Sequence, residues 1–259
     1  MLLAVDIGNT ETTLGLFADD KLRSRWRMTT ATDRTPDEWS AMITGYVINE
    51  GHSTHEVRAA VEASVAPVVT AMLSEGINRA IGVNPVTVSA ATDLPVVLDV
   101  EDPLSVGADR VVNSLAALHL YQRDTIVVDF GTATTFDCVT GDGRFIGGVI
   151  APGVRTASEE LVKKAAKLFA TELVEPENVI GRRTEDCIRS GILYSSSDSV
   201  DGIVRRIKAS WPGENEPYVV ATGGMAPVIV PLTTQVEHVE PDLALHGLLV
   251  AAKHLGLEW

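Results

Sequence analysis

The chain has 259 residues, of which 45% are hydrophobic and 22% are charged, a composition that fits one large globular domain or two halves of about 120–130 residues. Its net charge of −14 repels nucleic-acid backbones and anionic lipid, so we expect no nucleic-acid partner and no membrane partner. The two cysteines, Cys138 and Cys187, form no CxxC pair, which argues against a zinc module or a disulfide framework and fits the reducing cytoplasm.

The N-terminal part begins with turn-linked apolar runs. They predict an antiparallel meander with strands at residues 1–5, 13–17 and 22–28, joined by turns at residues 8–10 and 19–20. A helix is predicted from Thr35 to about Asn49, because Thr35 is followed by a proline and two acids, the residue types that favour a helix start. Strands and helices are then expected to alternate, with strands at 57–65 and 86–89 and helices at 67–80 and 107–120.

The second part of the chain repeats this order. A second meander is predicted at residues 125–128, 134–139 and 144–150. Helical patterns follow at 156–170 and 184–209, then a strand at 218–221 and a last helix at 243–255.

The two meanders also resemble each other in sequence. LLAVDIGNTETTLGLF and TIVVDFGTATTFDCV superpose, aligning Asp6 with Asp129, Gly8 with Gly131 and Thr12 with Thr135. A single Asp-x-Gly is common in turns, but two of them, each at the end of an apolar strand and followed by threonine, indicate a duplicated unit with a cleft between its halves. We therefore expect an N-terminal half at residues 1–120 and a C-terminal half at residues 121–259.

Each Asp-Gly turn offers the groups that phosphoryl transfer requires. A tight glycine turn exposes backbone N–H groups that can hold phosphate oxygens, and nearby threonines add hydroxyl donors. A carboxylate at the strand end, such as Asp6, can hold a hydrated Mg²⁺ that bridges phosphates. The alternative for either aspartate alone is a simple cap of a hairpin turn. No Gly-Lys pair occurs, so the chain has no Walker loop.

Two further segments are candidates for a site. In DPLSVGADR, Asp109 and Arg110 follow Gly107 in the first turn of a helix, where Arg110 can hold a carboxylate and Asp109 can accept a hydroxyl proton. The alternative there is a capping aspartate with a solvated arginine. In ATGGM, Gly223 and Gly224 let a base or ribose approach the backbone closely, although an ordinary strand-to-helix turn would look the same.

These motifs occur in a familiar order along nearly the whole chain. They are DIGNT at 6–10, DPLSVGADR at 102–110, DFGTATTFD at 129–137, GGVIAPG at 147–153, IGRRT at 180–184 and ATGG at 221–224. Together they resemble type III pantothenate kinase, a family in the acetate kinase, sugar kinase, heat-shock ATPase and actin superfamily. The resemblance implies an α/β, duplicated ribonuclease-H-like fold, in which two mixed sheets are flanked by helices around a central nucleotide cleft.

The resemblance also implies a reaction and a set of residues. The implied activity is phosphorylation of pantothenate by ATP to 4′-phosphopantothenate, the first step of coenzyme A synthesis, in a cytoplasmic homodimer that uses Mg²⁺ and a monovalent cation, K⁺ or NH₄⁺. Matched by motif, Asp109 is the base, Asp6 binds Mg²⁺ with the phosphates, and Asp129 binds the monovalent cation. The implied ATP-binding residues are Asp6, Ile7, Gly8, Asn9, Thr10, Glu11, Thr12, Thr13, Thr132, Gly223 and Gly224. The implied pantothenate-binding residues are Gly107, Ala108, Asp109, Arg110 and Thr184.

The chain departs from the family pattern at a few positions. Val100 stands where a tyrosine usually forms one wall of the pantothenate pocket, and Arg183 stands where asparagine is common. Two other functions stay open at this point: a superfamily kinase for another small hydroxy acid, and a non-catalytic regulatory relative with the same fold.

Overall fold

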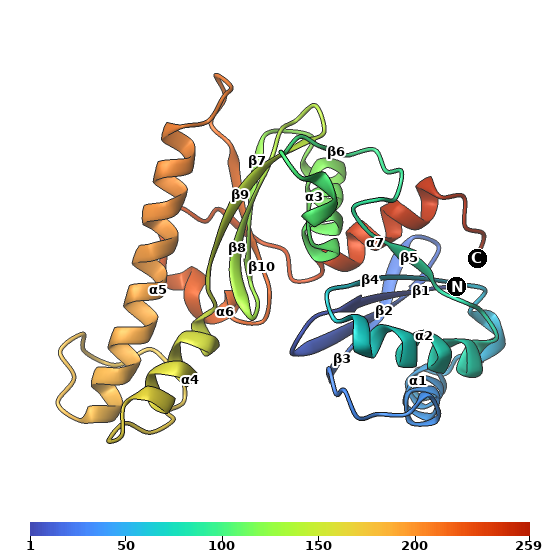
Figure 1. The fold of residues 1–259 in the computed structure, drawn as a ribbon, viewed down its shortest axis with the longest axis horizontal. Coiled ribbons are helices and arrows are strands. Elements are labelled where there is room, and N and C mark those ends of the chain that lie inside the picture. Colours follow the sequence, from blue (N-terminus) through green and yellow to red (C-terminus); the bar gives the residue numbers. More distant parts are fainter. The chain divides into compact units, whose positions relative to one another are not determined.

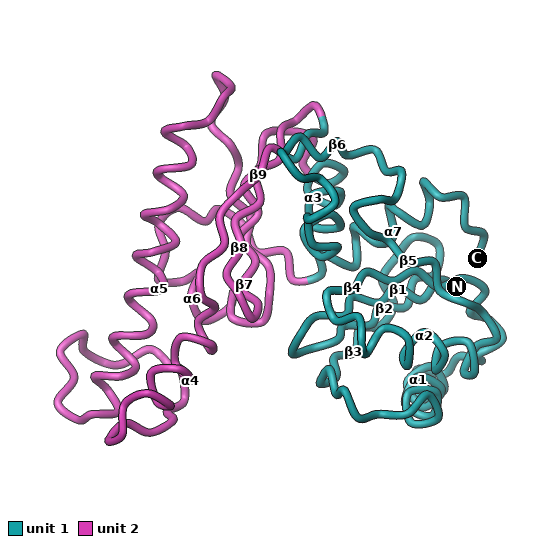
Figure 2. Tube along the Cα trace, in the orientation of Figure 1, with its two compact units in different colours: residues 1–120, 143–145, 242–259 teal, residues 121–142, 146–241 magenta.

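The structure, a computed structural model, describes residues 1–259. The chain divides into two units (Figure 2): unit 1 comprises residues 1–120, 143–145 and 242–259, and unit 2 comprises residues 121–142 and 146–241. The last helix thus belongs to unit 1, together with the N-terminal residues.

Unit 1 is built on a mixed five-stranded sheet with the order β3-β2-β1-β4-β5 (Figure 1). The predicted meander is confirmed as β1 (Leu2–Ile7), β2 (Glu11–Ala18) and β3 (Lys21–Thr29), which pair antiparallel. The strands β4 (Ala59–Ser64) and β5 (Val86–Val88) extend the sheet in parallel with β1. The carboxyl ends of β1 and β4 therefore lie at the same edge of the sheet.

Helices cover both faces of this sheet because the side chains of a strand alternate between the faces. From β1, Leu3, Val5 and Ile7 join a buried cluster with the helices α1 (Pro36–Asn49) and α2 (Pro67–Ile81). Leu2 and Ala4 join a second cluster with α3 (Ala108–Tyr121) and α7 (Leu243–His254). The remaining elements of this unit are β6 (Val97–Leu98), which pairs with residues 144–145, and the 3₁₀ helices η1 (Thr54–Glu56) and η2 (Pro103–Ser105).

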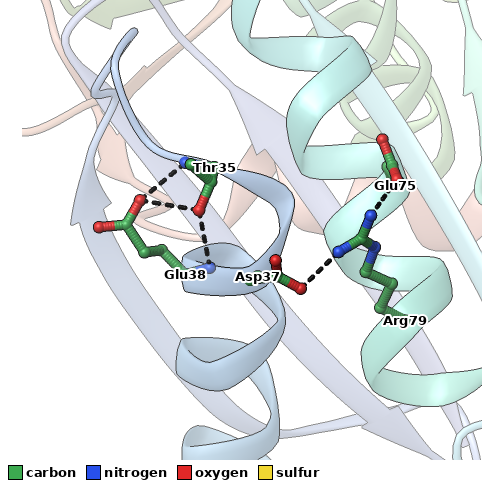
Figure 3. Close-up of polar contacts among 5 residues, drawn as sticks. All are labelled: Thr35, Asp37, Glu38, Glu75 and Arg79. Carbon is green, nitrogen blue, oxygen red and sulfur yellow. Dashed lines mark hydrogen bonds and ion pairs between the residues drawn. The ribbon is translucent and has the colours of Figure 1, made fainter.

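The start of α1 forms as its sequence predicts (Figure 3). The hydroxyl of Thr35 accepts a hydrogen bond from the Glu38 N–H, and the Glu38 carboxylate accepts one from the Thr35 N–H. This reciprocal capping box satisfies donors that an α-helix leaves unpaired at its N-terminus. The Arg79 guanidinium on α2 pairs with both Asp37 on α1 and Glu75, so it links the two helices at the surface.

Unit 2 contains the second meander. Its strands are β7 (Thr125–Phe130), β8 (Ala133–Val139) and β9 (Arg144–Pro152), and they lie in a sheet of order β11-β10-β7-β8-β9-β6. The strands β10 (Tyr218–Thr222) and β11 (His238–Val239) extend it in parallel with β7. The helices are α4 (Val154–Lys164), α5 (Thr184–Ala209), the short α6 (Ala226–Ile229) and the 3₁₀ helix η3 (Val230–Leu232).

The core of unit 2 packs α5 against one face of β7. Ile126, Val128 and Phe130 of β7 share one buried cluster with α5 side chains that include Leu193 and Val204. The helix runs from residue 184 to residue 209, as its pattern predicts. None of the helices in the chain combines the length and the apolarity that a membrane span requires.

The two hairpins repeat each other, but with one difference. Asp6 pairs with Thr13 across β1 and β2, whereas Asp129 pairs with Thr135 across β7 and β8. The first turn is therefore one residue longer than the second, and Thr13, not Thr12, is the structural counterpart of Thr135. The predicted superposition of Thr12 on Thr135 is wrong by one position because an ungapped alignment cannot show a turn insertion.

The predicted helix at 156–170 is only partly correct. Helix α4 ends at Lys164, and residues 165–183 contain no helix. The two apolar side chains of this segment that reach the core, Leu168 and Leu173, are five positions apart. A helix would place residues three or four apart on one face, so this spacing suits an irregular chain.

Candidate active site

The turn after β1 is closed by glycine. The Gly8 N–H donates to the Glu11 carbonyl at 3.1 Å, and a Cβ atom on Gly8 would lie 2.8 Å from that oxygen. Any other residue would push the turn open, so Gly8 fixes the backbone that follows Asp6. Asn9 and Thr10 lie at the exposed tip of the turn. This arrangement presents polar groups to solvent immediately beyond the strand that carries Asp6.

Thr12 stabilises the turn from inside. Its side chain is fully buried, and its hydroxyl lies 2.8 Å from that of Thr30, which in turn donates to the Gly8 carbonyl at 2.8 Å. This placement argues against the expected direct contact of Thr12 with a phosphate. Ile7 is also fully buried, so it can act only through its backbone, whose carbonyl accepts from the Val65 N–H. The sequence alone did not identify Thr30.

The segment around Asp109 lies at the same sheet edge as this turn. Val65 follows β4 directly, and its N–H donates to the Ile7 carbonyl at 3.0 Å, which joins the ends of β4 and β1. A Cβ atom on Gly107 would lie 3.6 Å from Val65 Cγ1 and only 2.5 Å from Asp109 Oδ1. Gly107 therefore leaves the space that the Asp109 carboxylate occupies beside the carboxyl ends of two parallel strands. Ligands of open α/β sheets bind at such ends.

Asp109 has an unusual electrostatic environment. Burial disfavours its charged form and raises the pKa of its carboxyl group, while the N–H and the charge of Arg110 lower the pKa in part. The Arg110 N–H donates to Asp109 Oδ1 at 2.8 Å, and the Arg110 guanidinium lies 5.1 Å from the ring centre of Phe145. A half-buried carboxylate of raised pKa is well suited to accept a proton. Phe145 is a further residue that the sequence did not single out.

Helix α7 fixes the position of α3. A Cβ atom on Gly247 would lie 1.9 Å from the Val112 carbonyl oxygen, so the two helices approach closely at this point. Val112 is on the turn that follows Asp109, and both helices share one buried cluster. The start of α3 is thus held by packing as well as by hydrogen bonds.

The second Asp-Gly turn, in unit 2, is enclosed by other glycines. Gly223 has φ +92°, a conformation that L-amino acids rarely adopt, and a Cβ atom there would lie 2.5 Å from Asp129 Oδ1 and 2.6 Å from the Phe130 nitrogen. The strands β10 and β7 pair Thr222 with Asp129, which brings the ATGG segment to the end of β7. Asp129, predicted to bind the monovalent cation, and Gly223, predicted to bind ATP, thus lie in contact.

A third segment lies against the same turn. A Cβ atom on Gly153 would lie 2.3 Å from the Thr132 carbonyl oxygen, and the Thr156 hydroxyl donates to that oxygen at 2.7 Å. Gly153 is the last residue of GGVIAPG, a motif seen in the sequence but not assigned to a site, and Thr156 lies three residues after it. Thr184, by contrast, is an exposed residue at the first position of α5.

The architecture, with its paired Asp-Gly turns, is the fold that sugar kinases and actin-like ATPases share. The structure resembles ROK hexokinase from Thermus thermophilus, with a TM-score of 0.51 and 13% identity over 98% of both chains. It also resembles component A of (R)-2-hydroxyglutaryl-CoA dehydratase from Acidaminococcus fermentans, with a TM-score of 0.56 and 14% identity over 98% of this chain and 96% of that one. At these identities the likeness concerns the fold.

Sequence comparison gives the family. Residues 2–206 match the family model of type III pantothenate kinase. The chain is 43% identical over 255 residues to the type III pantothenate kinase of Thermomicrobium roseum, an alignment that covers 98% of each protein. The chain therefore belongs to the type III pantothenate kinase family, as its motifs predicted.

Proposed function

We propose that the chain phosphorylates pantothenate with ATP, forming 4′-phosphopantothenate and ADP in the cytoplasm as the first step of coenzyme A synthesis. The observation that carries this proposal is the family match over nearly the full length of the chain. It is supported by the half-buried Asp109 beside the ends of β1 and β4, where the Gly8 turn also lies. A regulatory relative would need neither this raised-pKa carboxylate nor the glycine that makes room for it.

The proposed reaction assigns a proton transfer to Asp109. An Asp109 carboxylate oxygen accepts the proton of the 4′-hydroxyl as that oxygen bonds to the γ-phosphorus of ATP, and the bond from the γ-phosphorus to the bridging oxygen breaks to release ADP. Arg110 binds the pantothenate carboxylate through its guanidinium. Gly107 and Ala108 supply the backbone next to the substrate.

The residues around the two turns fit the nucleotide and its ions. Mg²⁺ keeps several waters and binds through one or two carboxylates plus phosphates, so Asp6 alone is an adequate protein ligand. In unit 2, Gly223 packs closely against Asp129 and Phe130, so the Asp129 carboxylate lies beside the backbone of the ATGG segment, and a carboxylate next to backbone carbonyl oxygens suits a monovalent cation. When bound, these ions neutralise phosphate charge. Backbone and hydroxyl groups of the two turns and the ATGG segment would bind ATP, namely Ile7, Gly8, Asn9, Thr10, Glu11, Thr13, Thr132, Gly223 and Gly224.

The test is an ADP-release assay with purified protein, Mg-ATP and K⁺. Pantothenate is compared with a panel of small hydroxy acids, including pantoate, which lacks the β-alanine carboxylate. We expect pantothenate to give the highest kcat/KM by at least about tenfold, because Arg110 supplies a charged contact for the β-alanine carboxylate. Higher activity with another hydroxy acid would favour the kinase of a different substrate, and no activity with any acceptor would favour a regulatory relative.

We further propose that the working unit is a homodimer in which Thr184 completes the pantothenate site of the partner. The segment that precedes α5 exposes apolar side chains suited to a contact with a second copy: Phe169 at 51%, Val174 at 41%, Val179 at 65% and Ile180 at 84% exposure. A stable dimer should bury at least about 1,000 Å² in total.

Mixed dimers test this arrangement. Asp109→Asn and Thr184→Arg are each expected to be inactive, and mixing them restores one intact site per heterodimer if the site is shared. No recovery of activity, with subunit exchange confirmed by native mass spectrometry, would show that each chain builds its own site. We also propose that the two halves of the chain, residues 1–120 and residues 121–259, derive from one duplicated unit.

A further inference from the structure

We infer that Arg155 binds the phosphates of the nucleotide and supplies the cationic side chain that a Walker lysine provides in other phosphate-binding loops. This inference rests on the proposed ATP-dependent reaction. The sequence contains no Gly-Lys pair, and its net charge of −14 disfavours a bound polyanion unless a local positive charge compensates. Neither Asp-Gly turn carries a lysine or an arginine between its strands.

The backbone places Arg155 next to the Gly131–Thr132 turn. Gly153 lies so close to this turn that a Cβ atom there would be 2.5 Å from the Gly131 carbonyl oxygen. On the other side of Arg155, the Thr156 hydroxyl donates to the Thr132 carbonyl at 2.7 Å. Arg155 is therefore held between two residues that both contact the turn, at the start of a helix of 11 residues whose N-terminus also favours anions.

The side chain of Arg155 extends toward the second glycine segment. Its Nε–H donates to Met225 Sδ at 3.4 Å, and Met225 directly follows Gly223 and Gly224. The Met225 N–H donates in turn to the Phe130 carbonyl at 3.4 Å, which links this contact to the end of β7. The guanidinium thus lies near both segments that are proposed to hold the nucleotide in unit 2.

The chemistry of this contact favours a ligand role. A thioether is a weak acceptor, and it uses one of the five N–H donors of a guanidinium, which otherwise match phosphate oxygens in pairs. Arg155 is an exposed side chain, so its other donors are accessible from solvent. The alternative is that Arg155 is an ordinary solvated surface arginine, whose removal would leave the nucleotide affinity unchanged.

The experiment measures nucleotide affinity by calorimetry for the wild type and three variants, with Mg-ATP and with adenosine. Arg155→Gln should weaken Mg-ATP binding about tenfold or more, because a hydrogen bond to a charged group contributes on that scale. Arg155→Lys should restore part of the loss, and adenosine affinity should not change. Arg205→Gln, which removes an exposed arginine from α5 in the same unit, is the matched control and should bind as the wild type does.

Two results would overturn the inference. Equal Mg-ATP affinity in Arg155→Gln and Arg205→Gln would show that Arg155 is a solvated surface residue. An equal loss for Mg-ATP and adenosine would place its effect on the nucleoside and not on the phosphates. Failure of the wild type to bind Mg-ATP would instead contradict the proposed function, and the inference with it.

Discussion

Replacing Asp109 by asparagine separates its proposed proton transfer from its structural role. Asparagine keeps an oxygen at Oδ1, so it can still accept the 2.8 Å hydrogen bond from the Arg110 N–H. It also carries no charge, and burial disfavours the charged form of Asp109. The variant should therefore fold at least as stably as the wild type, and any loss of activity reports the missing base.

The expected loss is large. Removal of a general base typically lowers the rate about 10²–10⁴-fold, which corresponds to about 2.7–5.4 kcal/mol of transition-state stabilisation.

The pH dependence of kcat/KM should change as well. Since the pKa of Asp109 is raised above its ordinary value, kcat/KM of the wild type should fall as the pH drops through that raised pKa. Asp109→Asn should lack this acidic limb.

The assay is ADP release across a pH series, with thermal unfolding of each variant as the check on folding. Asp102→Asn is the matched control, because Asp102 is an exposed aspartate of the same segment, just before η2. It should retain wild-type kinetics. Near-normal turnover by Asp109→Asn with an unchanged pH profile would refute the assignment of the base.

Three further changes test other parts of the structure. Gly223→Ala forces an alanine into φ +92° beside Asp129, so it should cost about 1–3 kcal/mol in urea unfolding and weaken K⁺ activation; an unchanged unfolding midpoint would contradict the packing. Thr35→Ala removes the cap that Glu38 completes and should cost about 1 kcal/mol without affecting kcat, whereas no loss would show that the cap contributes little. Glu62 is 1% exposed and burial raises its pKa, so its contribution to stability is fully present at low pH and is lost as the pH rises through the raised pKa. Glu62→Gln should therefore reduce the dependence of the unfolding free energy on pH. An unaltered pH dependence in this variant would contradict the prediction.

The parts of the fold that the sequence predicted best have strong local signals. Helix α5 and the capping box at Thr35 both follow from local patterns, apolar periodicity in one and hydroxyl-and-acid spacing in the other. The two-residue strands β6 and β11 were not predicted, because they form by pairing with distant strands and carry no pattern of their own. The irregular segment 165–183 escaped prediction for a similar reason, since only tertiary packing selects Leu168 and Leu173 for the core.

In the candidate site, too, the sequence identified residues with local signals and missed residues that act through long-range contacts. Gly8, Gly107 and Gly223 were identifiable from turn chemistry, and the structure gives each a close contact that excludes a side chain. Thr30 was not identifiable, because it acts on a turn that is distant in sequence. Gly153 lies in the GGVIAPG motif, but its contact with the distant Gly131–Thr132 turn was not predicted. Thr12 was expected at the phosphates and is instead buried against Thr30. The direction of its side chain depends on the strand face that it occupies, and the one extra residue in the first turn decides that face.

The most direct test of the proposed reaction is identification of its product. Wild-type protein is incubated with Mg-ATP, K⁺ and pantothenate, and the product is examined by mass spectrometry and by ³¹P NMR with proton coupling. We expect one phosphate on the 4′-oxygen, coupled to the adjacent methylene protons, with ADP released in equal amount, and loss of this product in Asp109→Asn. ADP release without phosphorylated pantothenate, or a phosphate on any other oxygen, would contradict it.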